Sequence, residues 1–406
     1  MSITVIRNAR VFYKRHIVVR DVLIKNGIIT KIGRVGTGEQ AIDARGRLLL
    51  PGAIDVHVHF RDLGEVYKED WYSGSCAAAA GGVTTVIDQP NTKPATCDEG
   101  SYFAKQRAAR KSVIDYGING AINRLDQLED VWRLGATAFG EAFIQRESRE
   151  DLLCALQTIK RLDAILCVHA ESRAGENPSE AAAIRKVFEC NRGVGAKIHV
   201  SHLSTAAGLD VVRASDQDVT CEVTPHHLFL SKLDNKRLGP FGTMNPPLRS
   251  QRDVALLWSH LDHVDMVASD HAPHSTADKK MPSAPPGVPG VQTLLPLLLS
   301  KLDQIGLGRF VDLVCTAPAD RFNLRSKGAI AEGFDADLIL VDLKDKKPIT
   351  SSLMRSKCGW TPFEGFEGVF PSLTMVRGEV VFNKGSIRAK KGWGRQVCGT
   401  GSGEPG

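Results

Sequence analysis

The chain has 406 residues, a mildly basic net charge of +6, and a hydrophobic content of 42%. This length suits one large barrel or sheet with a smaller module. Lys and Arg form no long run, which argues against nucleic-acid binding, and no apolar run is long enough to span a membrane. The nine cysteines lack CxxC spacing, which argues against a disulfide framework and favours a reducing, cytoplasmic location.

Residues 1–50 alternate apolar and polar side chains and are predicted to form strands and turns. Between 51 and 327, short apolar runs rich in β-formers alternate with helix-like stretches. The apolar runs are 52–58, 82–88, 116–122, 137–144, 164–170, 197–203, 218–224 and 265–270. The helix-like stretches lie near 71–80, 98–110, 126–133, 148–161, 178–192, 205–215, 250–260 and 291–305. Eight strands in series with helices predict an α/β fold, a (β/α)8 barrel of the TIM type; an open doubly wound sheet is the alternative.

The β pattern returns over 328–390, for example in "DADLILVD" and "LTMVRGEVVF". We therefore expect a small composite β-sandwich domain that is built from both termini, 1–50 and 328–390, beside the 51–327 catalytic barrel. The last segment, 391–406, ends in "GTGSGEPG" and is predicted to be a flexible tail.

Histidines gather at the C-terminal ends of the predicted barrel strands, where barrels of this kind carry their active sites. The first strand ends in "HVH", and the two-residue period of a strand places His57 and His59 on one face. Later strands end in or near His169, His199, His202 and Asp270. Neutral imidazole and carboxylate are the ligands that Zn²⁺ and similar metals prefer. Independent core histidines would not all fall at one end of the barrel, so the pattern predicts a metal centre.

Glu141 is the single charged residue of the fourth predicted strand, "TAFGEAFI". A lone carboxylate in a buried strand is costly unless it is paired or bound to a metal. An ion pair with Lys or Arg is the alternative. A carboxylate that faces the histidine cluster is well placed to bridge two cations.

The histidines lie within longer motifs that follow one another along nearly the whole chain. They are "DVHVHFRD", "KED", "AAAAGGVTTV", "QPNTKP", "VHAE", "HVSHLST", "VTPHHLFL", "MNPPLR", "SDHAPH", "PPGVPGVQTLLPLLL", "GWTPFEG" and "VRGEVVF". HxH alone is weakly specific, but the ordered set resembles the dihydroorotase family, in the cyclic-amide hydrolase branch of the amidohydrolase superfamily. The resemblance implies a barrel with a composite β-sandwich domain. It also implies reversible, zinc-dependent cyclisation of N-carbamoyl-L-aspartate to (S)-dihydroorotate in de novo pyrimidine (UMP) biosynthesis.

The resemblance implies two zinc ions with a bridging hydroxide, which is the nucleophile in the hydrolytic direction. The implied ligands are His57, His59 and Asp270 for one zinc, and His169 and His202 for the other. Asp270 would also be the general acid and base, and His199 would be structural. Many relatives bridge the metals with a carboxylated lysine on the fourth strand, where this chain has Glu141. We therefore expect Glu141 to be the bridge, without a carboxylated lysine.

Arg61 offers a planar guanidinium suited to the substrate carboxylate; a solvated surface charge is the alternative. The resemblance implies further substrate contacts from His59, Asn91, Asn245, His274, Pro286 and Gly287. The segment 272–290 is rich in Pro, Gly and Ser. We expect it to be a mobile lid, and a disordered surface loop is the alternative. His226 and His227 are predicted to be structural.

The expected partners are small-molecule substrates, with neither nucleic acid nor membrane, and either a homo-oligomer or an association with aspartate transcarbamoylase. The nearest alternative functions are a dihydropyrimidinase (hydantoinase) or an allantoinase, whose substrates lack the carboxylate of dihydroorotate. Arg61, Asn91 and His274 together argue against both. A non-catalytic, dihydroorotase-like structural subunit is another alternative, but such proteins lose metal ligands. Gln89 and Asp62-Leu63 depart from the family pattern beside the predicted site.

Overall fold

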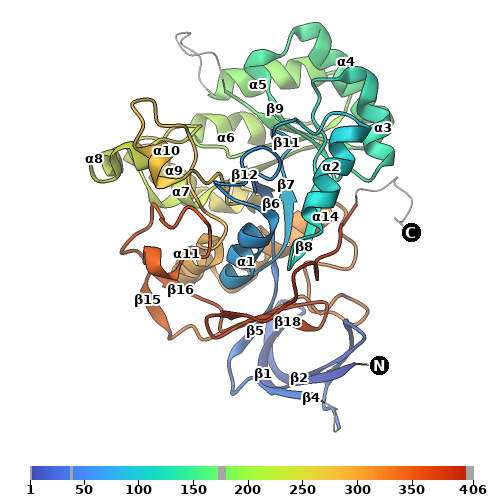
Figure 1. Cartoon of the computed structure of the whole chain (residues 1–406), viewed down its shortest axis with the longest axis vertical. Helices are drawn as coiled ribbons and strands as arrows, with labels where there is room; N and C mark the ends of the chain where they lie inside the picture. Colours follow the sequence, from blue (N-terminus) through green and yellow to red (C-terminus); the bar gives the residue numbers. More distant parts are fainter. Residues whose placement is uncertain (1, 37–39, 172–179, 399–406) are drawn as a thin grey trace.

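A computed structural model describes residues 2–36, 40–171 and 180–398. The described chain forms a helix-covered barrel that stands on a sheet domain, to which both ends of the chain contribute (Figure 1). The sheet domain lies at the bottom of the view, where the first strands and the last strands of the chain meet.

The barrel strands pair in parallel, and nearly all of their residues are buried. One run has the order β6-β7-β8, and the other has the order β13-β12-β11-β10-β9. These strands are β6 (Ala53–Val58), β7 (Val83–Asp88), β8 (Asp115–Ile118), β9 (Phe139–Phe143), β10 (Ile165–His169), β11 (Lys197–Val200), β12 (Val219–Val223) and β13 (Met266–Val267). Backbone bridges link Gly120 to Phe139 and Val58 to His271, which connects the two runs at both sides. The predicted eight-stranded barrel is thus confirmed.

Helices follow the strands in the order that the sequence pattern predicts. The longer ones are α1 (Trp71–Gly81), α2 (Glu99–Ala109), α3 (Leu128–Arg133), α4 (Arg149–Arg161), α5 (Glu180–Asn191), α6 (Ala206–Arg213), α9 (Gln251–Ser259) and α11 (Leu294–Ser300). Shorter ones are α7 (Pro225–Phe229), α8 (Asn235–Leu238), α10 (Thr276–Lys279), α12 (Leu302–Ile305), α13 (Leu307–Val311) and α14 (Ala317–Arg321). Side-chain N-caps fix where α1 and α2 begin, because the carboxylates of Asp70 and Asp98 accept backbone N–H groups in the first turns of these helices.

Strands from both termini form one nine-stranded sheet. Its members are β1 (Ile3–Tyr13), β2 (His16–Lys25), β3 (Ile28–Gly33), β4 (Gln40–Asp43), β5 (Leu48–Pro51), β14 (Leu338–Val341), β17 (Leu373–Val376), β18 (Glu379–Asn383) and β19 (Ser386–Ile387). The two halves join where β5 pairs antiparallel with β14. Side chains from the two halves share one buried core, which includes Val11, Ile24, Leu49, Leu338 and Met375. The composite sheet domain is confirmed, whereas the limits 1–50, 51–327 and 328–390 stay a prediction. A separate antiparallel pair, β15 (Lys346–Pro348) and β16 (Glu367–Val369), lies between β14 and β17 in sequence.

Residues 391–398 differ from the flexible tail predicted for 391–406. The backbone N–H of Tyr116 in β8 donates to the carbonyl of Arg395 (2.9 Å), and the N–H of Val397 donates to the carbonyl of Tyr116 (2.8 Å). Trp393 packs against the main hydrophobic core, so backbone hydrogen bonds and this apolar contact fix 391–398 beside β8. The rest of the predicted tail, 399–406, lies outside the described residues. Within the described ranges, no helix combines the length and the apolar character needed to cross a membrane.

Candidate metal centre

The structure brings all six predicted metal ligands together at the C-terminal end of the barrel. They are His57 in β6, His59 just after it, Glu141 in β9, His169 at the end of β10, His202 after β11 and Asp270 after β13. All six are buried, and none exposes more than 8% of its surface. Parallel strands end at one edge, so side chains that are far apart in sequence converge there.

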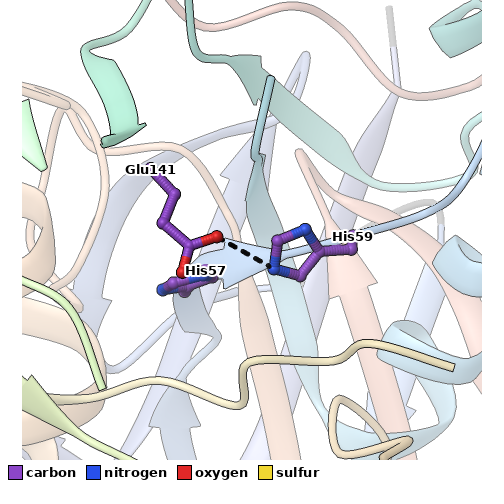
Figure 2. Close-up of side chains that lie close together, drawn as sticks. All are labelled: His57, His59 and Glu141. Carbon is purple, nitrogen blue, oxygen red and sulfur yellow. Dashed lines mark ion pairs between the residues drawn. The ribbon is translucent and has the colours of Figure 1, made fainter. Parts of the chain in front are cut away.

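Glu141 belongs to two separate groups of candidate ligands. One atom each from His57, His59 and Glu141 lies within 4.8 Å of the others, and the same holds for Glu141, His169 and His202. Figure 2 shows the carboxylate of Glu141 pointing toward the rings of His57 and His59. Its Oε2 lies 3.8 Å from Nε2 of His59, and its Oε1 lies 2.6 Å from Nδ1 of His169 and 2.7 Å from Nε2 of His202. Each carboxylate oxygen thus faces a different group.

The predicted alternative for Glu141 was an ion pair with Lys or Arg. In the described ranges its ion-pair partners are all histidines. Burial alone would raise the pKa of Glu141, but His169 and His202 hold this pKa well below its usual value. The carboxylate is therefore ionised at neutral pH.

Asp270 faces the first of these two groups, which consists of His57, His59 and Glu141; the second group consists of Glu141, His169 and His202. Its Oδ1 lies 3.1 Å from Nε2 of His59 and 3.6 Å from Nε2 of His57. Burial would raise the pKa of Asp270, but hydrogen bonding to His59 and the charge of His57 lower it below the usual range. This carboxylate is also ionised at neutral pH and can accept a proton.

The donor set fits metal ions. Nε2 of His57 and Nδ1 of His202 are buried and have no hydrogen-bond partner in the described structure. Buried polar atoms without a partner are uncommon and call for a ligand or a water. Four imidazoles around two carboxylates are a donor set that suits Zn²⁺.

Glu222 of β12 contacts two of the candidate ligands, His57 and His202, and the sequence analysis did not identify it. Its Oε1 lies 2.6 Å from Nδ1 of His57 and accepts the backbone N–H of His202 at 3.1 Å, while its Oε2 lies 3.0 Å from Nε2 of His199. Burial would raise the pKa of Glu222, but His57 and His199 lower it to about 2. An ionised Glu222 holds a proton on Nδ1 of His57 and leaves Nε2 free for a metal. The available signal was a lone carboxylate in a buried strand, as for Glu141.

Glu171, from the "VHAE" motif, has a similar place beside the second group. Its Oε2 lies 3.2 Å from Nε2 of His169, whose Nδ1 faces Glu141. Asn245, a predicted substrate contact, places Nδ2 3.2 Å from the same Nε2 of His169. Burial would lower the pKa of His169, but Glu141 and Glu171 raise it to about 9.

The predicted carboxylate-binding residues lie beside the first group. Nη2 of Arg61 lies 3.4 Å from Nε2 of His274, and that nitrogen donates to the carbonyl of Pro286 at 2.9 Å. Burial and the charge of Arg61 lower the pKa of His274 to about 3, so its ring is neutral at neutral pH. Nε of Arg61 is buried without a partner in the described structure and is free to donate to an anion.

Asn91 and Gly287 complete the predicted set. Nδ1 of His59 donates to Oδ1 of Asn91 at 2.8 Å, and Nδ2 of Asn91 donates to Glu141 at 3.4 Å. Both polar atoms of Asn91 thus contact candidate metal ligands, and its contact with substrate stays a prediction. Gly287 has φ +133°, and a Cβ there would lie 2.5 Å from the carbonyl oxygen of Ala272. Only glycine fits this position without a shift.

The residues that depart from the family pattern have structural contacts. Gln89 donates to the carbonyl of Val56 and accepts from Asn119, both at 3.2 Å. Asp62 pairs with Lys111. His227 is buried between Thr224 and the carbonyl of Pro246, as expected for a structural histidine.

A parallel barrel whose strand ends gather histidines around two carboxylates has the architecture of the metal-dependent barrel hydrolases. A family model described as the amidohydrolase family matches residues 48–381. The chain belongs to the amidohydrolase family and, within it, to the dihydroorotases, as its curated relatives indicate.

A dihydroorotase of Methanosarcina mazei is 43% identical, with 98% of each chain covered. A dihydroorotase of Halobacterium salinarum is 42% identical, with 92% of this chain and 96% of the relative covered. Among solved structures, an L-hydantoinase (dihydropyrimidinase) from Arthrobacter aurescens has a TM-score of 0.93 at 28% identity, covering 98% of this chain and 100% of its own. A D-hydantoinase (dihydropyrimidinase) from a Thermus species has a TM-score of 0.90 at 26% identity, covering 98% of this chain and 99% of its own.

Proposed function

We propose that this enzyme is a zinc-dependent dihydroorotase, which interconverts N-carbamoyl-L-aspartate and (S)-dihydroorotate in de novo pyrimidine biosynthesis. The observation that supports this most is the Glu141 carboxylate shared between two histidine groups. The identities of 43% and 42% to proteins named dihydroorotase favour this activity over that of the hydantoinases, which are 28% and 26% identical.

Two zinc ions are the proposed cofactors, and Glu141 would bridge them. The proposed ligands are His57, His59 and Asp270 for one zinc, and His169 and His202 for the other. When bound, the ions would lower the pKa of a water molecule and polarise the ring carbonyl of the substrate. Asp270 on the first side and the shared Glu141 supply two negative charges, which offset part of the charge of the two cations.

Asp270 is the proposed general acid and base. Its ionised carboxylate would accept a proton in the hydrolytic direction and donate it to the ring nitrogen as the amide bond breaks. In the biosynthetic direction the same carboxylate would accept a proton from the carbamoyl nitrogen as the ring closes. The 3.1 Å contact to Nε2 of His59 holds the Asp270 carboxylate beside the first group of candidate ligands.

Arg61 is the proposed partner of the substrate carboxylate. Its planar guanidinium can form two parallel hydrogen bonds, and the neutral ring of His274 beside it adds no competing charge. The backbone at Pro286 and Gly287 would lie beside the ring of the substrate, because Gly287 allows a close backbone approach there. Asn245 would contact substrate from the side of the second group.

A hydantoinase or dihydropyrimidinase is the second candidate, because the fold matches such enzymes with TM-scores of 0.93 and 0.90. One assay separates the candidates: purified enzyme is offered dihydroorotate, dihydrouracil, hydantoin and allantoin at equal concentration. We expect turnover of dihydroorotate in excess over the uncharged rings. Preference for an uncharged ring would refute the proposal. The structural-subunit alternative would regain support if the protein purified without zinc, were inactive, and gained no activity when zinc was added.

A further inference from the structure

Lys279 is a buried lysine that lacks a carboxylate partner in the described structure. It is the last residue of α10, and none of its surface is exposed. Its ammonium group donates instead to three backbone carbonyls: Thr243 at 2.8 Å, Pro285 at 3.0 Å and Gly287 at 3.1 Å. Burial of an unpaired charge is costly unless hydrogen bonds compensate. The three carbonyls supply these hydrogen bonds, and the lysine in turn fixes the backbone segments that carry them.

The three carbonyls belong to two loops that carry proposed substrate contacts. Thr243 lies two residues before Asn245, and Pro285 and Gly287 flank Pro286. The backbone N–H of Gly287 also donates to the carbonyl of Thr243 at 3.0 Å. The Lys279 ammonium therefore joins the loop around 243–246 to the far end of the segment 272–290.

Trp360, from the "GWTPFEG" motif, fixes the near end of the same segment. Its Nε1 donates to the carbonyl of His274 at 2.9 Å, and its ring centre lies 5.9 Å from the Lys279 nitrogen. Trp360 thus fixes the near end of 272–290, and Lys279 fixes its far end to the loop at Thr243. A mobile lid, which the Pro, Gly and Ser content predicts, would have to break both sets of contacts to open.

We propose that Lys279 is a positioning residue, which fixes Asn245, His274, Pro286 and Gly287 in their substrate-binding arrangement before substrate arrives. The inference rests on the proposed function for the identity of the substrate. A single ammonium with three N–H groups matches three carbonyls. Burial lowers the pKa of the Lys279 amine to about 8, so the ammonium form predominates at neutral pH.

The test compares Lys279→Met with Lys280→Met, because Lys280 is the exposed neighbour. Met keeps an unbranched chain and removes the three donors. For Lys279→Met we expect the KM for dihydroorotate to rise about tenfold or more, because loosely held groups bind less well, with kcat within about threefold of the wild type. Hydrogen–deuterium exchange should become faster in 240–247 and 272–290, and zinc content should stay unchanged. Lys280→Met should match the wild type, and Lys279→Arg should give an intermediate KM.

Two results with Lys279→Met would overturn the proposal: unchanged KM and unchanged exchange, or a loss of zinc and kcat at constant KM. Should Lys279→Met not fold, exchange in the wild type decides. The proposal requires 272–290 to be protected in the free enzyme and little changed by dihydroorotate. Fast exchange that slows only with substrate would show a lid and refute it. A wild type inactive on dihydroorotate would refute the proposed function, while the exchange comparison would still test Lys279.

Discussion

Oε1 of Glu222 lies 2.6 Å from Nδ1 of His57, and neither side chain is exposed to solvent. A charged carboxylate at this position fixes the proton of the ring on Nδ1 and orients Nε2 toward Asp270 and Glu141. The same Glu222 oxygen accepts the backbone N–H of His202. One buried carboxylate on β12 therefore supports a candidate ligand from each side of the centre.

Glu222→Gln should weaken zinc binding by about 10- to 100-fold. The amide oxygen can still accept a hydrogen bond, but the negative charge that favours a protonated Nδ1 on His57 is lost. Chelator competition measures the affinity. Glu189→Gln, at an exposed position of α5, is the control and should bind zinc like the wild type. Equal affinity in both variants would show that Glu222 does not support the centre.

Asp270→Asn should lower kcat by about 10²- to 10⁴-fold, the contribution typical of a general acid or base. Asn keeps the shape of the side chain but cannot carry the proton between the water and the ring nitrogen. Steady-state rates in both directions, at saturating zinc, measure the effect. A variant that retained a tenth of the wild-type rate would remove Asp270 from this role.

Arg61→Lys should raise the KM for dihydroorotate and for N-carbamoyl-L-aspartate while the melting temperature changes little. Lys keeps the charge but loses the planar pair of donors. Initial rates across substrate concentration, with a thermal melt as the check on folding, give both quantities. An unchanged KM in both directions would mean that another residue binds the carboxylate.

Much of the barrel and the centre could be predicted because the signals are local. Two-residue periodicity placed His57 and His59 together, and a lone carboxylate in an apolar strand drew attention to Glu141. The same signal was present at Glu222 in "VTCEV". Its partners, His57 on β6 and His199 on β11, are far away in sequence, so no local pattern indicates what Glu222 contacts.

Other features had no local signal. Lys279 contacts backbone carbonyls, which every residue carries, so its partners cannot be recognised from side-chain types. Similarly, 391–398 has the polar, glycine-containing composition of a tail. Its attachment to β8 depends on backbone hydrogen bonds at Tyr116 and on the packing of Trp393.

Zinc binding should release protons, with an apparent affinity that rises with pH up to about 9 to 10. In the metal-free protein, burial would lower the pKa of His57 and His169, but neighbouring carboxylates raise them to about 10 and about 9. Raised pKa values also stabilise the metal-free fold. That contribution is complete below about pH 6.5, the ordinary histidine value, and is lost as pH rises through 9 and 10. Calorimetric titration in buffers of different ionisation enthalpy counts the protons, and zinc binding without proton release would contradict these assignments.

Glu141 is proposed to hold two zinc ions together, because its carboxylate offsets the repulsion between cations in a buried site. Glu141→Gln keeps the shape and removes the charge, so the second zinc and the activity should be lost together. Added bicarbonate should not change the wild-type activity, because the proposed bridge is a glutamate carboxylate that needs no CO₂.

An anomalous diffraction map at the zinc edge, on wild-type crystals, would locate the metal ions relative to Glu141. We expect two peaks, one beside His57, His59 and Asp270 and one beside His169 and His202, with the Glu141 carboxylate between them. A single peak, or two peaks joined by a water or a free anion with Glu141 turned away, would contradict it.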